Sequence, residues 1–329
     1  MLQALAGFDR LVLLGDVLEL RQGPVHEALG ASEEVFRDLA AALGSGRQII
    51  IVPGNHDHHL LGPWLERCSL TTTPPPLGLQ TAVSWRAGET LAAIAGWLEP
   101  VDVEVAYPGV WLRPDTFATH GHYGDRHTTV PLLERLGVGL MARVVREAAA
   151  GPRRAEDYEA TLAPIYAWIH AVAQAGGLGA GPDGASAQAW QALSGRGRGR
   201  GLRRRTVVAA FPVLIAALNR ARVGPLRADL SPAELRRAGL RAFTEVLSRL
   251  GVDAPHVIFG HTHRAGPQPD DDQTEWRSSS GAHLINTGSW VHEPGFLGAA
   301  SQTSPYRAGF AAVLDADAPP ELVNLLDRV

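Results

Sequence analysis

The sequence of 329 residues carries 30 basic and 34 acidic residues, for a formal net charge of −4 at pH 7, and 45% of its residues are hydrophobic. This length suits one large α/β domain or one domain with an insertion, and the charge balance gives no general case for nucleic-acid binding. The single cysteine, Cys68, excludes an internal disulfide, and the N-terminal residues lack the basic segment and apolar run of a signal peptide.

The first part of the chain predicts two buried strands that end in polar residues. An apolar run at residues 11–14 is followed by Gly15-Asp16, and a β-branched run at 49–52 is followed by Pro53-Gly54 and then Asn55-His56-Asp57. Between them, apolar residues at helical spacing predict a helix that is capped by Ser32 and ends at Gly44. The order strand, helix, strand favours a right-handed crossover and a parallel pair.

The remainder predicts a helical insertion between strands. Short strands at 101–106 and 110–112 precede a strand at 117–119 that ends in His120-Gly121-His122, and a strand at 257–259 ends in Gly260-His261-Thr262-His263. Between these two motifs the apolar spacing is helical, and Ser231 opens a capping box for a helix that runs to Gly251. We therefore predict an α/β core formed by residues 1–127 and 253–329, and a helical cap formed by residues 128–252.

Four apolar runs thus end in a carboxylate, an amide or an imidazole beside a glycine. Divalent metal ions take these side chains as ligands, and ligands of open α/β sheets bind at strand ends. The alternative for any single run is a polar loop after a core strand.

In this order, the motifs Gly15-Asp16, Gly54-Asn55-His56-Asp57, His120-Gly121-His122 and Gly260-His261-Thr262-His263 resemble those of the calcineurin-like metallophosphoesterase family. Residues 284–290 also resemble the penultimate core strand of that family. The resemblance covers about residues 8–127 and 254–326. It implies an α/β fold of the four-layer α/β/β/α sandwich type, with the insertion as a helical cap.

The resemblance also implies a site and a reaction. Asp16, Asn55, His120 and His261 would surround one divalent ion, and Asp16 would bridge to a second ion that His263 also binds; manganese, iron, zinc and magnesium are the expected metals. A metal-bound hydroxide would attack a phosphoester or pyrophosphate bond, His56 would donate a proton to the leaving oxygen, and Asp57 would orient His56. His122 would contact the substrate, with a surface histidine as the alternative. His58 and His59 are expected to open a short helix, and Asp125 and His127 are not expected to be ligands.

The sequence departs from the family because no Asp-x-His motif precedes Gly15-Asp16, and that motif would complete the second metal site. Three explanations are open: the chain begins within a longer protein, the protein works with one ion, or it is a catalytically impaired metal-binding or scaffolding member. Glu19 stands where the family often has Asp, and we expect this replacement to be tolerated.

Arg196–Arg205 holds six arginines and is followed by the apolar residues 207–218. We expect a solvated loop before a core helix; the alternative is a polybasic patch that contacts anionic membranes. A cap inserted between the histidine motifs, together with this basic and apolar surface, resembles the UDP-2,3-diacylglucosamine pyrophosphatase branch of the family. The expected substrate is therefore a phosphorylated small molecule, a nucleotide or a lipid-linked compound. We expect a cytoplasmic protein, with a peripheral membrane location as the alternative, and no nucleic-acid partner. A nucleic-acid-binding module is a further alternative that rests on the arginines alone.

Overall fold

The structure is a computed structural model of the chain. It describes residues 2–72, 75–131, 133–175, 213–220, 224–229, 231–292, 297 and 302–327, without the side chains of residues 133 and 134. The stretch Arg196–Arg205 lies outside the described residues, so the predicted polybasic patch has no structural account.

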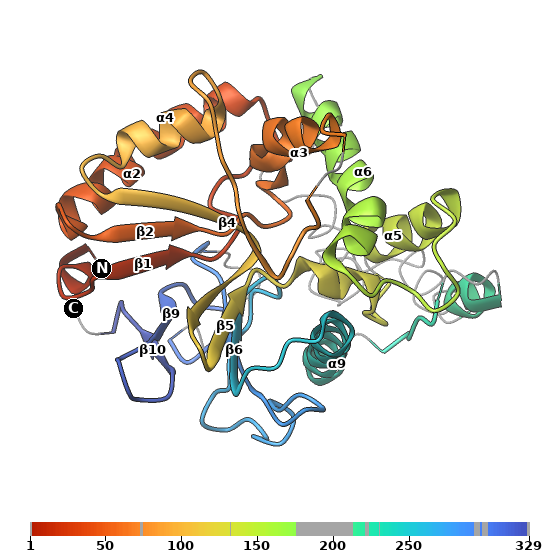
Figure 1. Cartoon of the computed structure of the whole chain (residues 1–329). Helices are drawn as coiled ribbons and strands as arrows, with labels where there is room; N and C mark the ends of the chain where they lie inside the picture. Colours follow the sequence, from red (N-terminus) through yellow and green to blue (C-terminus); the bar gives the residue numbers. More distant parts are fainter. Residues whose placement is uncertain are drawn as a thin grey trace, which may run out of the picture.

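A mostly parallel sheet of eight strands forms the centre of the fold (Figure 1). Its strand order is β1 (Arg10–Leu13), β2 (Gln48–Ile51), β4 (Asp102–Arg113), β5 (Thr116–Thr119), β6 (His256–Phe259), β8 (His283–Thr287) and β7 (Ala265–Gly266), and β3 (Gln80–Ala82) pairs with β4. The pairs β1 with β2, β2 with β4, β5 with β6 and β6 with β8 are parallel. The α/β class and the parallel pairing of the first two strands are therefore confirmed.

Strand β4 explains how distant parts of the chain meet. We predicted two short strands here, but the structure has one strand of 12 residues. Its first half pairs in parallel with β2, up to Ile51 opposite Val105, and its second half pairs antiparallel with β5, from Thr119 opposite Gly109. Since β2 and β5 run towards each other along β4, the residues after both strands emerge near the middle of β4.

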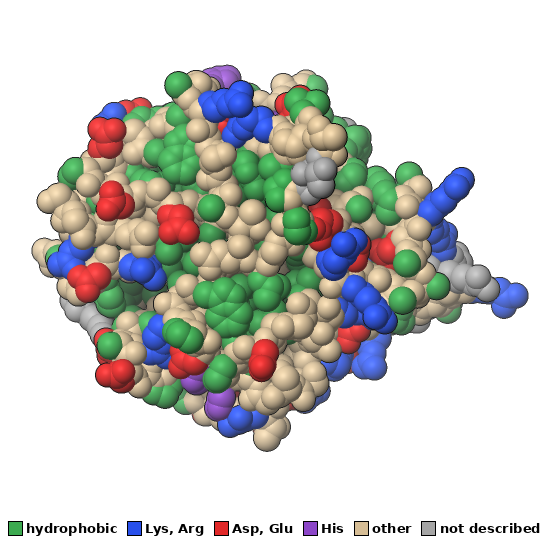
Figure 2. Space-filling model, in the orientation of Figure 1, with side chains coloured by type: hydrophobic (Ala, Val, Ile, Leu, Met, Phe, Trp, Pro, Cys, Tyr) green, Lys and Arg blue, Asp and Glu red, His purple; other side chains and the backbone are tan. Residues whose placement is uncertain are grey.

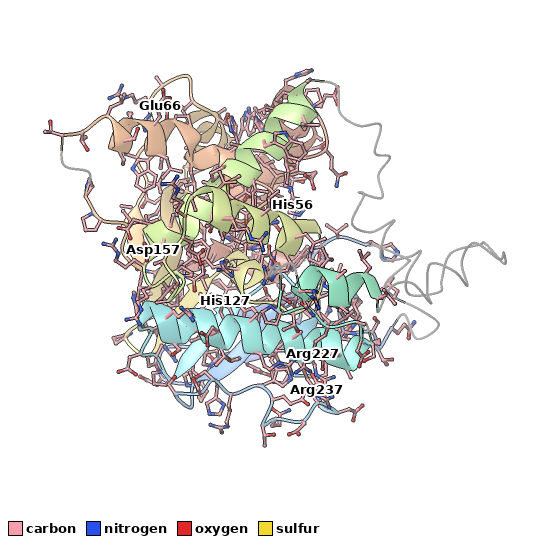
Figure 3. The ribbon with its side chains drawn as sticks, turned by 90° about the vertical axis from the view of Figure 1, so that its right-hand side faces the viewer. His56, Glu66, His127, Asp157, Arg227 and Arg237 are labelled. Carbon is pink, nitrogen blue, oxygen red and sulfur yellow. The ribbon has the colours of Figure 1, made fainter. Side chains whose placement is uncertain are left out.

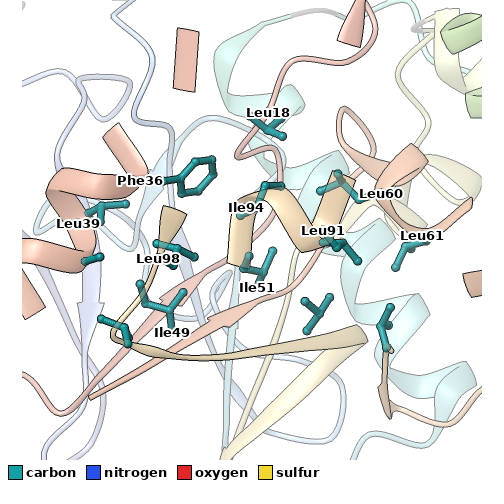
Figure 4. Packing of buried hydrophobic residues seen from close by; sticks show 14 of the residues in the cluster. Leu18, Phe36, Leu39, Ile49, Ile51, Leu60, Leu61, Leu91, Ile94 and Leu98 are labelled. Carbon is teal, nitrogen blue, oxygen red and sulfur yellow. The ribbon is translucent and has the colours of Figure 1, made fainter. Parts of the chain in front are cut away.

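Helices α1 (Leu2–Leu5), α2 (Val25–Leu43), α3 (Gly62–Ser69) and α4 (Thr90–Trp97), with the 3-10 turn η1 (His58–Leu61), pack beside β1, β2 and β4. Figure 4 shows the cluster in which Phe36 of α2 and Ile94 of α4 meet Ile49 and Ile51 of β2. The predicted start of α2 was wrong: the Ser32 hydroxyl lies inside the helix and donates to the carbonyls of Ala28 and Leu29.

On the other side of the molecule lie α5 (Leu133–Val144), α6 (Ala155–Gln174), the helical residues 213–220 and α9 (Pro232–Leu250), together with the 3-10 turn η2 (His122–Arg126) (Figure 1). The hydroxyl of Ser231 accepts the Glu234 N–H, which confirms the predicted start of α9. Phe243 of α9 stacks on Phe259 of β6 with ring centroids 4.0 Å apart, so α9 packs directly on the sheet. The division into a core and a cap remains a prediction.

Strands β9 (Phe310–Val313) and β10 (Glu321–Asn324) form a separate antiparallel pair, and their residues Ala312 and Leu322 pack against the buried cluster around Ile50 and Ile258. Figure 2 shows acidic side chains spread over the visible face, whereas basic side chains gather towards the helical side. In the part of the chain that the structure describes, no helix is both long enough and apolar enough to cross a membrane.

Candidate metal centre

The loops after β1, β2, β5 and β6 bring the predicted ligands together. Asp16, His120 and His261 form a group whose ligand atoms all lie within 4.8 Å of one another. Oδ2 of Asp16 is 3.1 Å from Nε2 of His120, and Oδ1 of Asn55 is 3.1 Å from both Nε2 of His120 and Nδ1 of His261. All four residues predicted around one ion are therefore in contact.

Close packing of the loop backbones makes this possible. A Cβ atom added at Gly54 would lie 2.4 Å from Oδ1 of Asp16 and 2.8 Å from a ring carbon of His120, and one at Gly15 would lie 2.1 Å from Nδ1 of His120. Glycine is needed at both positions because the ligand side chains occupy the space of a methyl group.

The two histidines lie between hydrogen-bond acceptors. Nδ1 of His120 is 2.9 Å from the Leu14 carbonyl oxygen, and Nε2 of His261 is 2.8 Å from Oδ1 of Asp125. If these nitrogens carry the ring protons of neutral imidazoles, the other nitrogen of each ring presents a lone pair to the oxygen of Asn55. A metal ion between them would satisfy these lone pairs, as would additional protons or an Asn55 amide turned so that its NH₂ group donates.

The pKa values of Asp16 and His120, which are buried side by side, agree with a positive charge at this point. Burial by itself raises the pKa of Asp16, but His120 and His56 hold it well below its ordinary value. Burial by itself lowers the pKa of His120, but the charge of Asp16 raises it to about 9. Without a metal the site therefore holds a proton on His120, and a divalent ion would replace that proton.

Backbone strain concentrates at the same residues. Among the described non-glycine residues, four have a positive φ, and three of them are Asp16 at 53°, His261 at 66° and His263 at 59°. This conformation is unfavourable for residues with a side chain and tends to persist at functional sites, where the surroundings hold it.

The predicted role of Asp57 in orienting His56 was wrong. The buried carboxylate of Asp57 accepts backbone N–H groups instead, with Oδ1 bonded to Gly54 at 2.6 Å and Asp16 at 3.3 Å, and Oδ2 bonded to Val17 at 2.8 Å and Leu18 at 3.4 Å. Asp57 therefore ties the loop that carries Asp16 to the loop that carries Asn55.

The partner of His56 is Glu19, whose Oε2 lies 2.5 Å from Nδ1 of His56. Burial lowers the pKa of His56, but the charge of Asp16 and the bond from Glu19 outweigh it, so the pKa lies above its ordinary value. The backbone N–H of His56 also donates to Oδ1 of Asp16 at 2.8 Å. Figure 3 shows His56 in the region between α6 and α9.

His122 is buried rather than exposed, which excludes the alternative of a surface histidine. Its Nε2 lies 3.0 Å from the hydroxyl of Tyr107, which donates to Glu159 of α6; Tyr123 and His58 contact the same carboxylate. Burial raises the pKa of Glu159, but His58 and the tyrosine hydroxyls together hold it below its ordinary value. Sequence patterns gave no signal for this network, because Glu159 lies on a helix far along the chain.

Three further histidines are outside the group of Asp16, His120 and His261, although His263 lies near enough to all three to interact with them electrostatically. His263 is outside the set of residues that could share one ion with Asp16, and burial lowers its pKa to about 4. His127 bonds through Nε2 to the hydroxyl of Tyr158 at 2.8 Å, and His59 stacks on His170 of α6 with centroids 3.6 Å apart. Asp125, which we did not expect at the site, contacts the ligand candidate His261.

Searches against models of protein families and against curated proteins give no match to this sequence. The function must therefore be inferred from the residues themselves.

Proposed function

We propose that the chain is a metal-dependent phosphoesterase similar to the calcineurin-like family, with the layered sandwich and helical cap of that family. The observation that carries the proposal is the convergence of His120, His261 and the amide of Asn55 beside the carboxylate of Asp16. Carboxylate, amide oxygen and two imidazoles suit manganese, iron, zinc or magnesium. When bound, such an ion supplies a Lewis acid for a phosphoryl oxygen and for water.

His56 would supply the proton for the leaving oxygen. Glu19 accepts from its Nδ1, which fixes the ring and leaves Nε2 free to reach a substrate. His122 would contact the substrate, which we expect to be a phosphorylated small molecule, a nucleotide or a lipid-linked compound. The order in which Asp16, Asn55, His56, His120 and His261 occur along the chain supports the likeness to the family.

A catalytically impaired, metal-binding member of the same fold is the second candidate. It is favoured by the incomplete second ion site, for which the family motifs matched in the sequence supply Asp16 and His263 alone. The substitution His56→Ala separates the two candidates. A phosphoesterase with His56 as its proton donor should lose turnover in His56→Ala and keep its metal. A catalytically impaired member should show no turnover even as the native protein.

The first experiment is elemental analysis of the protein after loading with manganese and removal of excess metal, with hydrolysis of p-nitrophenyl phosphate and bis(p-nitrophenyl) phosphate measured in parallel. We expect at least one ion per chain in the native protein, none in His120→Ala, and native metal content in the control His127→Ala. A native protein without bound metal would refute the proposal. Two ions per chain would support a dinuclear site, and one ion would support a mononuclear site.

A further inference from the structure

The two candidate histidine ligands are held from behind by different groups. The distal nitrogen of His120 faces a neutral backbone carbonyl, that of Leu14, at 2.9 Å. The distal nitrogen of His261 faces the carboxylate of Asp125 at 2.8 Å. Asp125 comes from η2, a different segment of the chain from the loop that carries His261.

We propose that Asp125 is a positioning residue that holds His261 in the tautomer required for metal binding; this inference rests on the metal centre proposed above. In this tautomer Nε2 of His261 carries the hydrogen and donates it to Oδ1 of Asp125, 2.8 Å away. The lone pair of Nδ1 then points towards Oδ1 of Asn55 at 3.1 Å, where the ion would lie. A carboxylate behind a ligand histidine also raises the basicity of the imidazole.

The surroundings of Asp125 argue against a purely structural ion pair. The residue is 5% exposed, and its Oδ2 is buried without a hydrogen-bond partner. Among the described residues, the neighbouring Arg126 pairs with Glu147, and Nε of Arg135 donates to the Thr128 carbonyl. A buried carboxylate needs compensating positive charge; Arg135 supplies part of it through electrostatic attraction to Asp125, and His261 together with a bound cation would supply more.

Asp125 also restrains the side chain of His261, whose backbone is strained. With φ at 66°, His261 occupies a conformation that a side chain disfavours. A hydrogen bond to the far side of the ring helps to keep the side chain directed at the ion site despite this strain.

The test uses the full chain with Asp125→Ala and Asp125→Asn. Titration calorimetry with Mn²⁺ measures affinity, and long-range ¹H–¹⁵N spectra of the metal-free protein report which ring nitrogen of His261 carries the hydrogen. We expect the affinity to fall by about 10- to 100-fold in Asp125→Ala, with loss of the Nε2–H tautomer of His261 alone. Asp125→Asn can still accept this hydrogen, so it should keep the tautomer and bind Mn²⁺ more weakly through loss of charge.

Tyr158→Phe is the matched control. It removes the hydroxyl that contacts His127, which lies two residues after Asp125, and should change the spectrum of His127 without changing Mn²⁺ affinity. Native affinity in both Asp125 variants, or an unchanged His261 tautomer in Asp125→Ala, would overturn the positioning role while leaving the metal centre intact. If the native protein binds no Mn²⁺, the metal centre itself is wrong, and the inference falls with it.

Discussion

Oε2 of Glu19 lies 2.5 Å from Nδ1 of His56, while Asp57, next to His56 in sequence, directs its carboxylate at backbone amides 2.6–3.4 Å away. The two carboxylates therefore have separate tasks. Glu19 holds the proposed proton donor, and Asp57 holds the loops that carry the metal ligands. Substitutions should separate these tasks.

Glu19→Gln should lower kcat by at least about 100-fold, the lower end of what a positioned acid or base contributes. The amide can no longer stabilise a charged His56, although it leaves Asp16, Asn55 and the histidines in place. Steady-state kinetics with bis(p-nitrophenyl) phosphate and metal content measured on the same sample check this. Glu33→Gln, on the exposed face of α2, is the control. A native kcat in Glu19→Gln would exclude the role of Glu19.

Asp57→Asn should lower the free energy of unfolding by at least about 1–3 kcal/mol. Both oxygens of Asp57 accept N–H groups, and an amide would turn its own N–H₂ towards two of these donors. Urea denaturation at pH 7 measures the change. Asp115→Asn, at a partly exposed turn, should have a much smaller effect; equal effects in the two variants would contradict the bracing role of Asp57.

Gly54→Ala should weaken Mn²⁺ binding and reduce activity by up to about 100-fold, the cost of a displacement of roughly 1 Å in an active site. The new methyl group would collide with Asp16 and His120. Gly30→Ala is the control, because a Cβ in that α2 position has no atom within 4 Å, and it should stabilise the helix by about 0.5–1 kcal/mol. If Gly54→Ala binds Mn²⁺ with native affinity in calorimetry, the loop can make room for the methyl group without weakening the metal site.

The stability of the metal-free protein should fall on acidification from pH 6.5 to 4. Burial, with the nearby His170 and His58, lowers the pKa of His59 from 6.5 to about 4, and burial with Arg126 lowers that of His127 to about 3. Between pH 4 and 6.5 these two side chains therefore bind more protons in the unfolded chain than in the folded chain, so their contribution to the free energy of unfolding rises with pH.

Urea denaturation of the native protein and of His59→Gln at pH 5 and 7 tests this. The variant should show a smaller difference between the two pH values, because its side chain at position 59 does not titrate. Val35→Ala, on the exposed surface of α2, should keep the full difference. An identical pH dependence in all three proteins would contradict the lowered pKa of His59.

The sequence alone determined the α/β class, the parallel pairing of the first two strands and the residues that meet around the proposed ion. The class and the pairing follow from local patterns: apolar runs of strand length, with glycines and polar side chains after them. Asp16, Asn55, His120 and His261 each lie one to four residues after a strand, and the resemblance of their motifs to the metallophosphoesterase family is what marked them as one ligand set.

The tertiary structure decided which groups stand behind those ligands. Glu19 rather than Asp57 contacts His56, Asp125 contacts His261, and Glu159 joins His58 to the tyrosines beside His122. No local pattern encodes these contacts, because each partner comes from another segment and its distance depends on how β4 and the helices pack. Hydrogen bonds need atoms within a few tenths of an ångström, and only the folded chain sets distances to that precision.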